Sequence, residues 1–261
     1  MKKLSAYFLI IMALISCNNE KTGKNTDKLT ETDTLAYTYK TISVYHQPIK
    51  KEDTTSAVIN FPVFDNDQLN NYIKRQVFDF FDPKEQATSY QDIANSFING
   101  YNEFSKENPD AEQSWYLQID ISVLRQFKNY IALAYTHQDF AGGAHGNTTI
   151  TYLNYNTETQ SPIELSTLFN EQNKKKLTQI AEKIFRKNEG LTTTESLSEN
   201  YFFENGKFDL AKNFYIGKKG LVFLYNPYEI KAYVNGTTEL IVPFTAIKGL
   251  SNPNSILSKL L

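Results

Sequence analysis

The sequence is poor in the residues that carry most enzyme chemistry. Its 261 residues include one cysteine, three histidines and one tryptophan. A single thiol forms no disulfide within the chain, so the folded core has to be stable without covalent cross-links. The chain also contains no HExxH zinc motif and no GxSxG nucleophile motif. These absences exclude the best-known signatures of zinc proteases and serine hydrolases.

Long apolar runs are scarce, and the most marked one begins the chain. Lys2 and Lys3 precede an apolar run over residues 4–15, which is shorter than the ~20 residues needed to span a bilayer. The run ends in residues 14–17 (LISC), which resemble the lipobox of bacterial lipoproteins. This resemblance implies that residues 1–16 are a signal peptide and that lipid is attached to Cys17. A plain signal peptide with an incidental Cys17 is the alternative.

Neither sign of charge dominates the chain. Without residues 1–16, it has 25 basic and 29 acidic residues. Nucleic-acid binding requires a clustered basic surface, so we expect no nucleic-acid partner. Aromatic residues are abundant instead, with 17 tyrosines and 18 phenylalanines. Much of this content must be core, but tyrosine also suits surfaces that contact glycans or proteins, because its ring is apolar and its hydroxyl is polar.

The first half of the chain predicts strands, two helices and a meander. Residues 17–35 are polar and predict a flexible tether before the folded part. Apolar periodicity then predicts helices over residues 67–81 and 89–106. β-branched and aromatic alternation predicts strands over residues 37–47, 56–64, 115–124, 129–135 and 148–155. The last three follow one another closely, as in an antiparallel meander.

Polar residues 157–161 and Pro162 predict a domain boundary. We therefore predict an N-terminal domain over residues 36–160 and a C-terminal domain over residues 161–250. The second domain is expected to contain an extended piece that leads into a turn (163–169), a helix (170–187) and strands (213–216, 221–225 and 239–242). From Ser251 on, the chain is expected to fray or to form one weak helical turn. Strands and helices come in blocks, so the predicted class is α+β: antiparallel sheet or sheets with helices packed on one face, in two intertwined subdomains. Whether the two halves share one sheet is left open.

Two blocks of the sequence resemble a known family. Residues 225–230 (YNPYEI), between strand-like runs, resemble the C-terminal domain of the RsiV-type, lysozyme-sensing anti-sigma factors. The half that contains residues 142–146 (GGAHG) looks like the N-terminal domain of the same family. This unit also accompanies PdaC-type peptidoglycan deacetylases as an accessory domain of unknown function. The resemblance covers about residues 36–249, assigns no lysozyme-contacting residue here, and includes no stretch similar to a PdaC-type catalytic domain.

The glycine-rich stretch over residues 136–147 is the first candidate site. We predict that it forms an exposed loop between two strands, which enters the groove of a partner. Its candidate recognition residues are His137, Asp139, Gly142, Gly143, His145 and Gly146. A metal held by His137, Asp139 and His145 is the enzymatic alternative. The spacing of the two histidines fits no metal motif, so we predict no metal and expect His145 to order the loop through hydrogen bonds.

The YNPYEI block is the second candidate site, with Tyr225, Pro227, Tyr228 and Glu229 as its residues. Glu229 is expected to bind backbone in the turn after Pro227. Tyr225, Tyr228 and Tyr233 suit either a core or a partner surface.

These features predict a lipid-anchored, extracytoplasmic protein of the cell envelope, on the outer membrane or the periplasmic face where two membranes exist. We expect it to recognise a lysozyme-like protein or peptidoglycan glycan without catalysis and without a cofactor. No catalytic residue is assigned. A small envelope hydrolase, metal-assisted at His137 and His145, is the main alternative, and a purely structural lipoprotein is the third.

Overall fold

The computed structural model describes residues 34–47, 54–81, 87–111 and 113–261. Residues 31–261 form one compact unit. The proposed signal peptide, Cys17 and nearly all of the proposed tether lie outside the described residues. No helix in the described part is long and apolar enough to cross a membrane.

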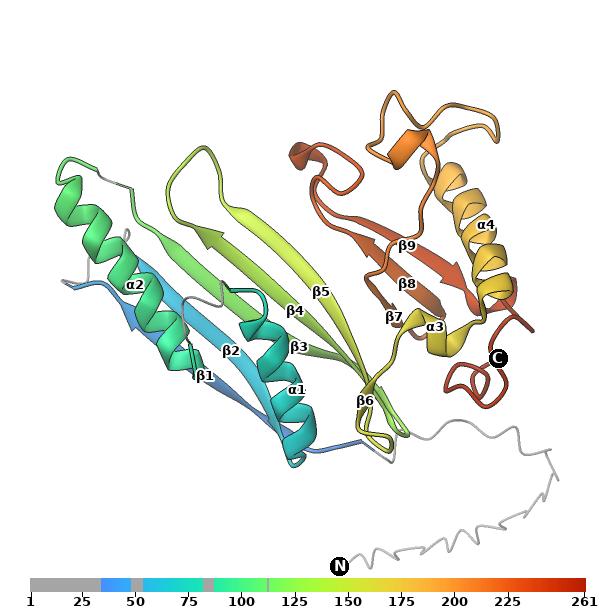
Figure 1. Cartoon of the computed structure of the whole chain (residues 1–261), viewed down its shortest axis with the longest axis horizontal. Helices are drawn as coiled ribbons and strands as arrows, with labels where there is room; N and C mark the ends of the chain where they lie inside the picture. The colour runs from blue at the N-terminus through green and yellow to red at the C-terminus, as the bar shows by residue number, and fades with distance from the viewer. Residues whose placement is uncertain (1–33, 48–53, 82–86, 112) are drawn as a thin grey trace, which may run out of the picture. The chain divides into compact units, whose positions relative to one another are not determined.

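The first half of the chain forms a six-stranded sheet in the order β1-β2-β3-β4-β5-β6 (Figure 1). Its strands are β1 (Tyr37–Tyr45), β2 (Ser56–Phe64), β3 (Tyr116–Phe127), β4 (Tyr130–Phe140), β5 (Asn147–Asn156) and β6 (Ser161–Pro162). All neighbouring pairs are antiparallel except β2 and β3, which are parallel. A parallel pair needs a long crossover, and the two helices between β2 and β3 provide it.

The two crossover helices lie on the same face of this sheet (Figure 1). They are α1 (Asp67–Phe78) and α2 (Tyr90–Glu107). Each begins at a polar N-cap: the side chain of Asn66 accepts a hydrogen bond from Leu69 N at 2.9 Å, and that of Ser89 accepts one from Asp92 N at 3.1 Å. These bonds satisfy backbone donors that a helix leaves unpaired at its start, which explains why both helices begin near the predicted residues.

The second half forms a separate three-stranded antiparallel sheet, so the two halves do not share one sheet. Its strands are β7 (Phe214–Ile216), β8 (Gly220–Tyr225) and β9 (Thr238–Pro243). Helix α4 (Glu171–Asn188) packs on β9 and buries Leu177, Ala181 and Phe185 at the predicted spacing. The 3₁₀ turns are η2 (Glu204–Gly206), η3 (Tyr233–Asn235) and η4 (Phe244–Ala246). The predicted α+β class with largely antiparallel sheets and packed helices is confirmed.

A polar joint connects the two sheets. The hydroxyl of Tyr130 in β4 donates to Asn154 Oδ1 at 2.5 Å and accepts from Ile216 N at 2.8 Å. Asn154 Nδ2 in turn donates to Phe214 O at 2.6 Å. Tyr130 is fully buried, and Asn154 is 5% exposed. Burial of a hydroxyl and an amide is tolerated because their partners satisfy them, and this matching fixes β7 against β4 and β5.

Two asparagines from the second half also pair with the edge of β5. Asn226 Oδ1 accepts from Ile150 N at 2.8 Å, and Asn226 Nδ2 donates to Ile150 O at 3.0 Å. Asn213 Oδ1 accepts from Tyr152 N at 2.7 Å, and its Nδ2 also donates to Ile150 O, at 2.7 Å. The side-chain amides thus take the place of a neighbouring strand, which protects an edge that would otherwise pair with another chain.

Two predicted details of the second half are wrong. Residues 163–169 contain the short helix α3 (Leu165–Leu168) where we expected an extended piece; Thr167 Oγ1 closes its first turn by donating to Glu164 O at 2.7 Å. Of the two alternatives for the chain from Ser251, fraying is wrong, because this end forms turns and Leu257 is fully buried in the second core. Asn252 anchors this end, because its N–H donates to Leu168 O at 2.7 Å.

Candidate functional site

The glycine-rich connection between β4 and β5 is shorter than expected. β4 continues through Phe140 and β5 begins at Asn147, with Asp139 opposite Asn147 in the ladder. The loop is therefore limited to residues 141–146. The prediction that His137 and Asp139 lie in an exposed loop is wrong: both belong to β4, and His137 is only 4% exposed.

His137 lies in a line of polar groups on the helix-covered face of β4. Its Nδ1 is 3.1 Å from the Tyr135 hydroxyl, and its Nε2 is 3.1 Å from Asp139 Oδ1. A neutral imidazole satisfies this geometry when the hydroxyl donates to Nδ1 and Nε2–H donates to the carboxylate. The ring also stacks on Phe80 at 4.2 Å between centroids. Burial lowers the pKa of His137, and this effect outweighs the opposing attraction of Asp139.

His145, by contrast, lies at the exposed tip and contacts the second half of the chain. Its ring stacks on Tyr233 with centroids 4.0 Å apart and planes 16° apart. The Tyr233 hydroxyl donates to Gly146 O at 2.8 Å, and the Tyr228 hydroxyl lies 3.5 Å from His145 Nε2. We call the group His145, Gly146, Tyr228 and Tyr233 the tip junction. The two candidate motifs, far apart in the sequence, therefore meet at one place.

The glycines of this loop have two different tasks. Gly142 and Gly143 have φ of 91° and 106°, a region that other residues rarely adopt, so they make the sharp reversal between β4 and β5. Gly146 is required by space: a Cβ there would lie 2.3 Å from the Tyr116 hydroxyl and 3.0 Å from Asp139 O. The loop is thus shaped to bring Gly146 close to both β3 and Tyr233.

The YNPYEI block forms the other side of the tip junction. Tyr225 is core, at 4% exposed, whereas Tyr228 is 58% exposed and has a φ of 69°. Glu229 Oε2 accepts from Asn226 N at 3.0 Å, so Glu229 binds backbone as predicted, at the residue that precedes the half-buried Pro227. A large residue with positive φ is uncommon, and here the turn holds its ring in solvent beside His145.

The metal alternative finds no ligand set in the structure. His137 is buried against Phe80 with both ring nitrogens in hydrogen-bonding contact, while His145 stacks on Tyr233 at the exposed tip. Among the described residues, no group of three His, Cys, Asp or Glu side chains is placed to hold a metal ion. Imidazole and carboxylate remain suitable ligand types, but this fold does not bring the three predicted groups together.

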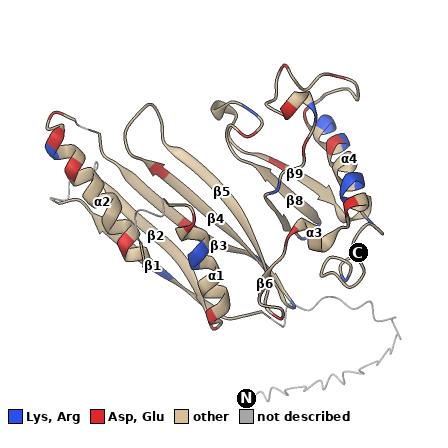
Figure 2. Ribbon diagram, in the orientation of Figure 1, with Lys and Arg blue, Asp and Glu red and all other residues tan. Residues whose placement is uncertain are grey.

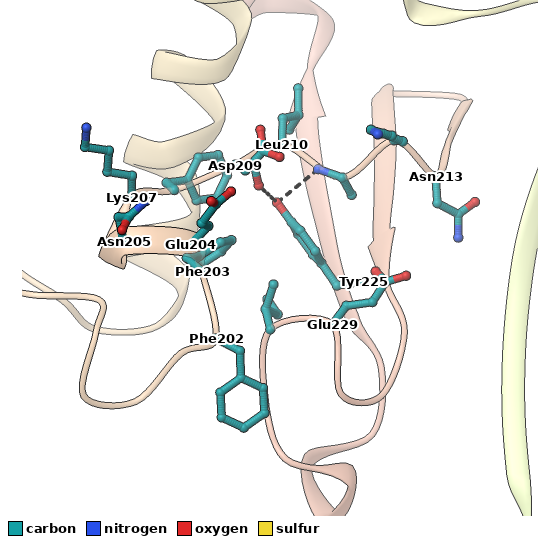
Figure 3. Close-up of a pocket in the computed structure, with 14 residues that line it drawn as sticks. Phe202, Phe203, Glu204, Asn205, Lys207, Asp209, Leu210, Asn213, Tyr225 and Glu229 are labelled. Carbon is teal, nitrogen blue, oxygen red and sulfur yellow. Dashed lines mark hydrogen bonds between the residues drawn. The ribbon is translucent and has the colours of Figure 1, made fainter.

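A cavity of about 610 Å³ lies in the second half, beside the core tyrosine of the YNPYEI block (Figure 3). The Tyr225 hydroxyl reaches the segment that forms one wall, donating to Asp209 O at 2.7 Å and accepting from Ala211 N at 3.2 Å. Burial raises the pKa of Tyr225, so its hydroxyl stays neutral and acts as a fixed structural bridge. The ring of Phe202 points away from this wall (Figure 3) and is 58% exposed.

A second cavity, about 600 Å³ in volume, lies between the two sheets. Tyr72 and Gln76 of α1, Asn154 of β5 and Lys174 of α4 contribute to its lining. Burial raises the pKa of Tyr72 to about 12. The polar joint already uses both side-chain atoms of Asn154. The cavity thus adjoins the structural contact that joins the two sheets.

Comparison with known proteins matches two parts of the chain to two family models. Residues 49–148 match the family described as Deacetylase PdaC, and residues 166–245 match the one described as Protein of unknown function (DUF3298). These matches confirm the PdaC-type resemblance seen in the sequence.

Among individual proteins, the chain is similar to the Bacillus subtilis protein named peptidoglycan-N-acetylmuramic acid deacetylase PdaC. The two are 23% identical over 207 residues, which cover 76% of this chain but 39% of that protein. A solved DUF3298 family structure from Bacteroides fragilis has a TM-score of 0.65 and 23% identity, covering 86% of this chain and 97% of that one. Another, from Pseudomonas aeruginosa, has a TM-score of 0.68 and 18% identity, covering 85% and 96%. At these identities the solved structures establish the fold alone.

Proposed function

We propose that this protein is a binding protein of the cell envelope, whose ligand is peptidoglycan glycan or a lysozyme-like protein and which catalyses no reaction on it. The Bacillus subtilis relative is named as a peptidoglycan deacetylase, which supports a cell-wall role. Only 39% of that protein is matched, so its deacetylase activity is not transferred to this chain. We further propose that the protein acts outside the cytoplasm and is anchored by lipid at Cys17.

The tip junction is the observation that carries this proposal. Tyr228 is exposed and lies beside the exposed His145, so an aromatic surface is available to a ligand. The His145–Tyr233 stack and the bond from Tyr233 to Gly146 O hold that surface in place before any ligand binds. Rigid, partly exposed aromatic side chains are typical anchors of protein interfaces, because little conformational freedom is lost on binding.

Calorimetric titration tests the proposal. The full chain is purified in a detergent without a sugar headgroup and titrated with lysozyme and, separately, with soluble peptidoglycan fragments. We expect saturable binding of one of them, weakened at least about tenfold by Tyr228→Ala or His145→Ala. Phe202→Ala is the matched control, because Phe202 is as exposed as Tyr228 but does not belong to the tip junction: its N–H donates to Ile230 O at 3.0 Å, and it lines the cavity beside Tyr225.

Mass spectrometry of the recovered fragments separates binding from catalysis. Unchanged fragments support recognition alone. Cleaved or deacetylated fragments would establish the hydrolase alternative instead. If folded Tyr228→Ala, His145→Ala and Gly143→Val variants bind every ligand as the wild type does, the tip junction is not the binding site.

A further inference from the structure

In the part of the chain that the structure describes, one face of the large sheet carries no helix. Along β3, Leu117, Ile119 and Ile121 are buried under the α1 and α2 side, and the residues between them point to the opposite face. On that opposite face Tyr116 and Ser122 are exposed. Figure 1 shows both crossover helices on the same side of the sheet. The alternation of β3 therefore leaves a row of polar and aromatic side chains without a covering element from the first half.

The second half covers only one end of this helix-free face. Phe127, Tyr130 and Ala132 at that end belong to the core of the second half. Towards the other end, the residues on this face are partly or fully exposed. We call this uncovered part the open face. Its central residues are Thr41, Asn60, Tyr116, Gln118, Asp120 and Gln138.

A chain of hydrogen bonds orders the open face across three strands. Thr41 Oγ1 donates to Asn60 Oδ1 at 2.6 Å, and Asn60 Nδ2 donates to Asp120 Oδ1 at 2.7 Å. Gln118 Nε2 donates to the other carboxylate oxygen of Asp120 at 2.7 Å. Gln138 stands opposite Gln118 on β4. These amides and hydroxyls are held in fixed positions and retain lone pairs and N–H groups that a polar ligand can use.

Aromatic rings border this polar row and connect it to the tip junction. Tyr116 is 42% exposed and stacks with Phe140, at 6.2 Å between centroids and 25° between planes. The Tyr116 hydroxyl lies against Gly146, where a Cβ would come within 2.3 Å of it. Because Gly146 O accepts from Tyr233, the open face and the tip junction form one continuous surface.

The open face carries almost no charge. The five long strands, β1 to β5, contain four charged residues: Lys40, Asp120, Arg125 and Asp139. Figure 2 shows the same pattern, with most colour on the helices. Lys40 and Asp139 stand opposite Phe61 and Leu117 on the helix-covered face, and Arg125 is bound to Ile216 O and Gly217 O of the second half.

This charge pattern selects among ligand classes. A nucleic acid or an anionic lipid surface requires clustered basic residues, which these strands lack. A neutral glycan presents hydroxyl and amide groups that suit Asn60, Gln118 and Asp120. The apolar C–H faces of its rings suit Tyr116 and Phe140.

We propose that the open face binds a neutral glycan strand that lies across β1 to β4, with Tyr116 as the stacking residue nearest the tip junction. The proposal takes its ligand class from the proposed function and adds the surface that binds this ligand. With strands ~4.8 Å apart, β1 to β4 spans about 14 Å, enough for several sugar rings. Tyr116 is a binding residue and Gln138 a second contact; Asp120 positions the amides of Asn60 and Gln118.

A titration with a defined sugar tests the open face. The probe is the tetrasaccharide of β-1,4-linked N-acetylglucosamine, added to the full chain in a detergent without a sugar headgroup. We expect Tyr116→Ala and Gln138→Ala each to weaken binding, Tyr116→Ala by at least about tenfold. Phe202→Ala again serves as the control. Thermal melts establish whether each variant is folded. If Tyr116→Ala does not fold, Gln138→Ala still tests the proposal, because the structure shows no side-chain hydrogen bond of Gln138 that the substitution would remove.

The outcomes separate this inference from the proposed function. Weakening by the two open-face variants but not by the control supports the inference. If both open-face variants bind the tetrasaccharide as the wild type does and Tyr228→Ala weakens this binding, the open face is not the site and the tip junction is. Binding of lysozyme but not of the tetrasaccharide also overturns the inference, with the proposed function standing for a protein ligand. Failure to bind lysozyme, peptidoglycan fragments and the tetrasaccharide overturns both.

Discussion

The polar joint between the two sheets makes a quantitative prediction through Tyr130. Replacing it by phenylalanine keeps the ring and removes only the hydroxyl, which bridges Asn154 Oδ1 and Ile216 N. Both partners are then left without this bond in a region where Tyr130 is 0% exposed, so water does not replace the hydroxyl without rearrangement. An unsatisfied buried polar group costs about 1–3 kcal/mol, so we expect Tyr130→Phe to lower the free energy of unfolding by about 2–4 kcal/mol.

Urea and thermal denaturation at pH 7 measure this effect. In a chain of this size, each kcal/mol corresponds to about 2–4 °C in Tm, so the expected decrease is roughly 5–15 °C. Fluorescence of the single tryptophan, Trp115, reports on the first half, and far-UV circular dichroism reports on both halves. If the fluorescence and circular dichroism transitions coincide, a single free energy of unfolding describes the protein. If they separate in the Tyr130→Phe variant, the joint couples the unfolding of the two halves.

Tyr45→Phe provides the matched control. The same atom is removed from a side chain that is 44% exposed, and the expected change is within about 0.5 kcal/mol. If Tyr130→Phe also stays within about 0.5 kcal/mol of the wild type, with coincident transitions, the reasoning about the joint is refuted. The Tyr130 hydroxyl would then add nothing measurable to the other contacts that hold the two sheets together.

Three further predictions follow from other contacts. Asn226→Ala removes the two bonds to Ile150 at the edge of β5 and should cost about 1–2 kcal/mol in urea denaturation; an unchanged midpoint would contradict the edge-pairing role. Burial lowers the pKa of His137 below the ~6.5 of the unfolded chain, so the unfolded state binds more protons. The contribution of His137 to the free energy of unfolding is therefore complete above pH 6.5 and is lost as the pH falls towards the folded pKa, by at most about 1.4 kcal/mol per pH unit. In urea denaturation at a series of pH values, His137→Gln should flatten this dependence. Gly146→Ala forces a Cβ against Tyr116 and should cost about 1–3 kcal/mol in thermal melts. Gly100→Ala is the control and should not destabilise the protein, because its Cβ would meet only Trp115 Cζ3, at 4.0 Å.

Periodicity in the sequence predicted most of the elements. The alternation around Ile119 defined a strand with one apolar face, and the spacing of Leu177, Ala181 and Phe185 defined a helix, because each pattern is local and repeats with the period of its structure. Helix starts were predicted at residues 67 and 89, and the helices begin at Asp67 and Tyr90. These features depend on neighbours in sequence, so the sequence alone was sufficient.

The extent of the glycine-rich loop could not be predicted in this way. His137 is polar, which suggested a loop, yet it continues β4 because Tyr135 and Asp139, two residues to either side, satisfy its ring nitrogens on the same face. Phe80, from the end of α1, supplies the stacking surface. A polar residue inside a strand is recognisable only once these partners are known.

The sequence predicted individual residues of the candidate site but not which of them lie together. The sequence singled out His145 and Tyr228 but gave no reason to place them together, since their contact depends on how the second half docks on β5. Tyr233 was noted only as core or partner surface, although it stacks on His145 and bonds Gly146. The open face was missed entirely, because alternation identifies two faces of a strand without showing which one the helices cover.

The docking of the second half on the first explains why the two halves are held in a fixed arrangement. The open face belongs to the first half, and Tyr228 and Tyr233 belong to the second half, yet the surface is continuous through Gly146. If the halves moved freely, a ligand that contacts both would have to order them, and the free energy of that ordering would weaken binding. The asparagine pairs at the edge of β5 and the buried Tyr130 bridge fix the halves beforehand. On the proposed function, the polar joint would serve recognition as well as stability, because neither half alone presents the whole surface.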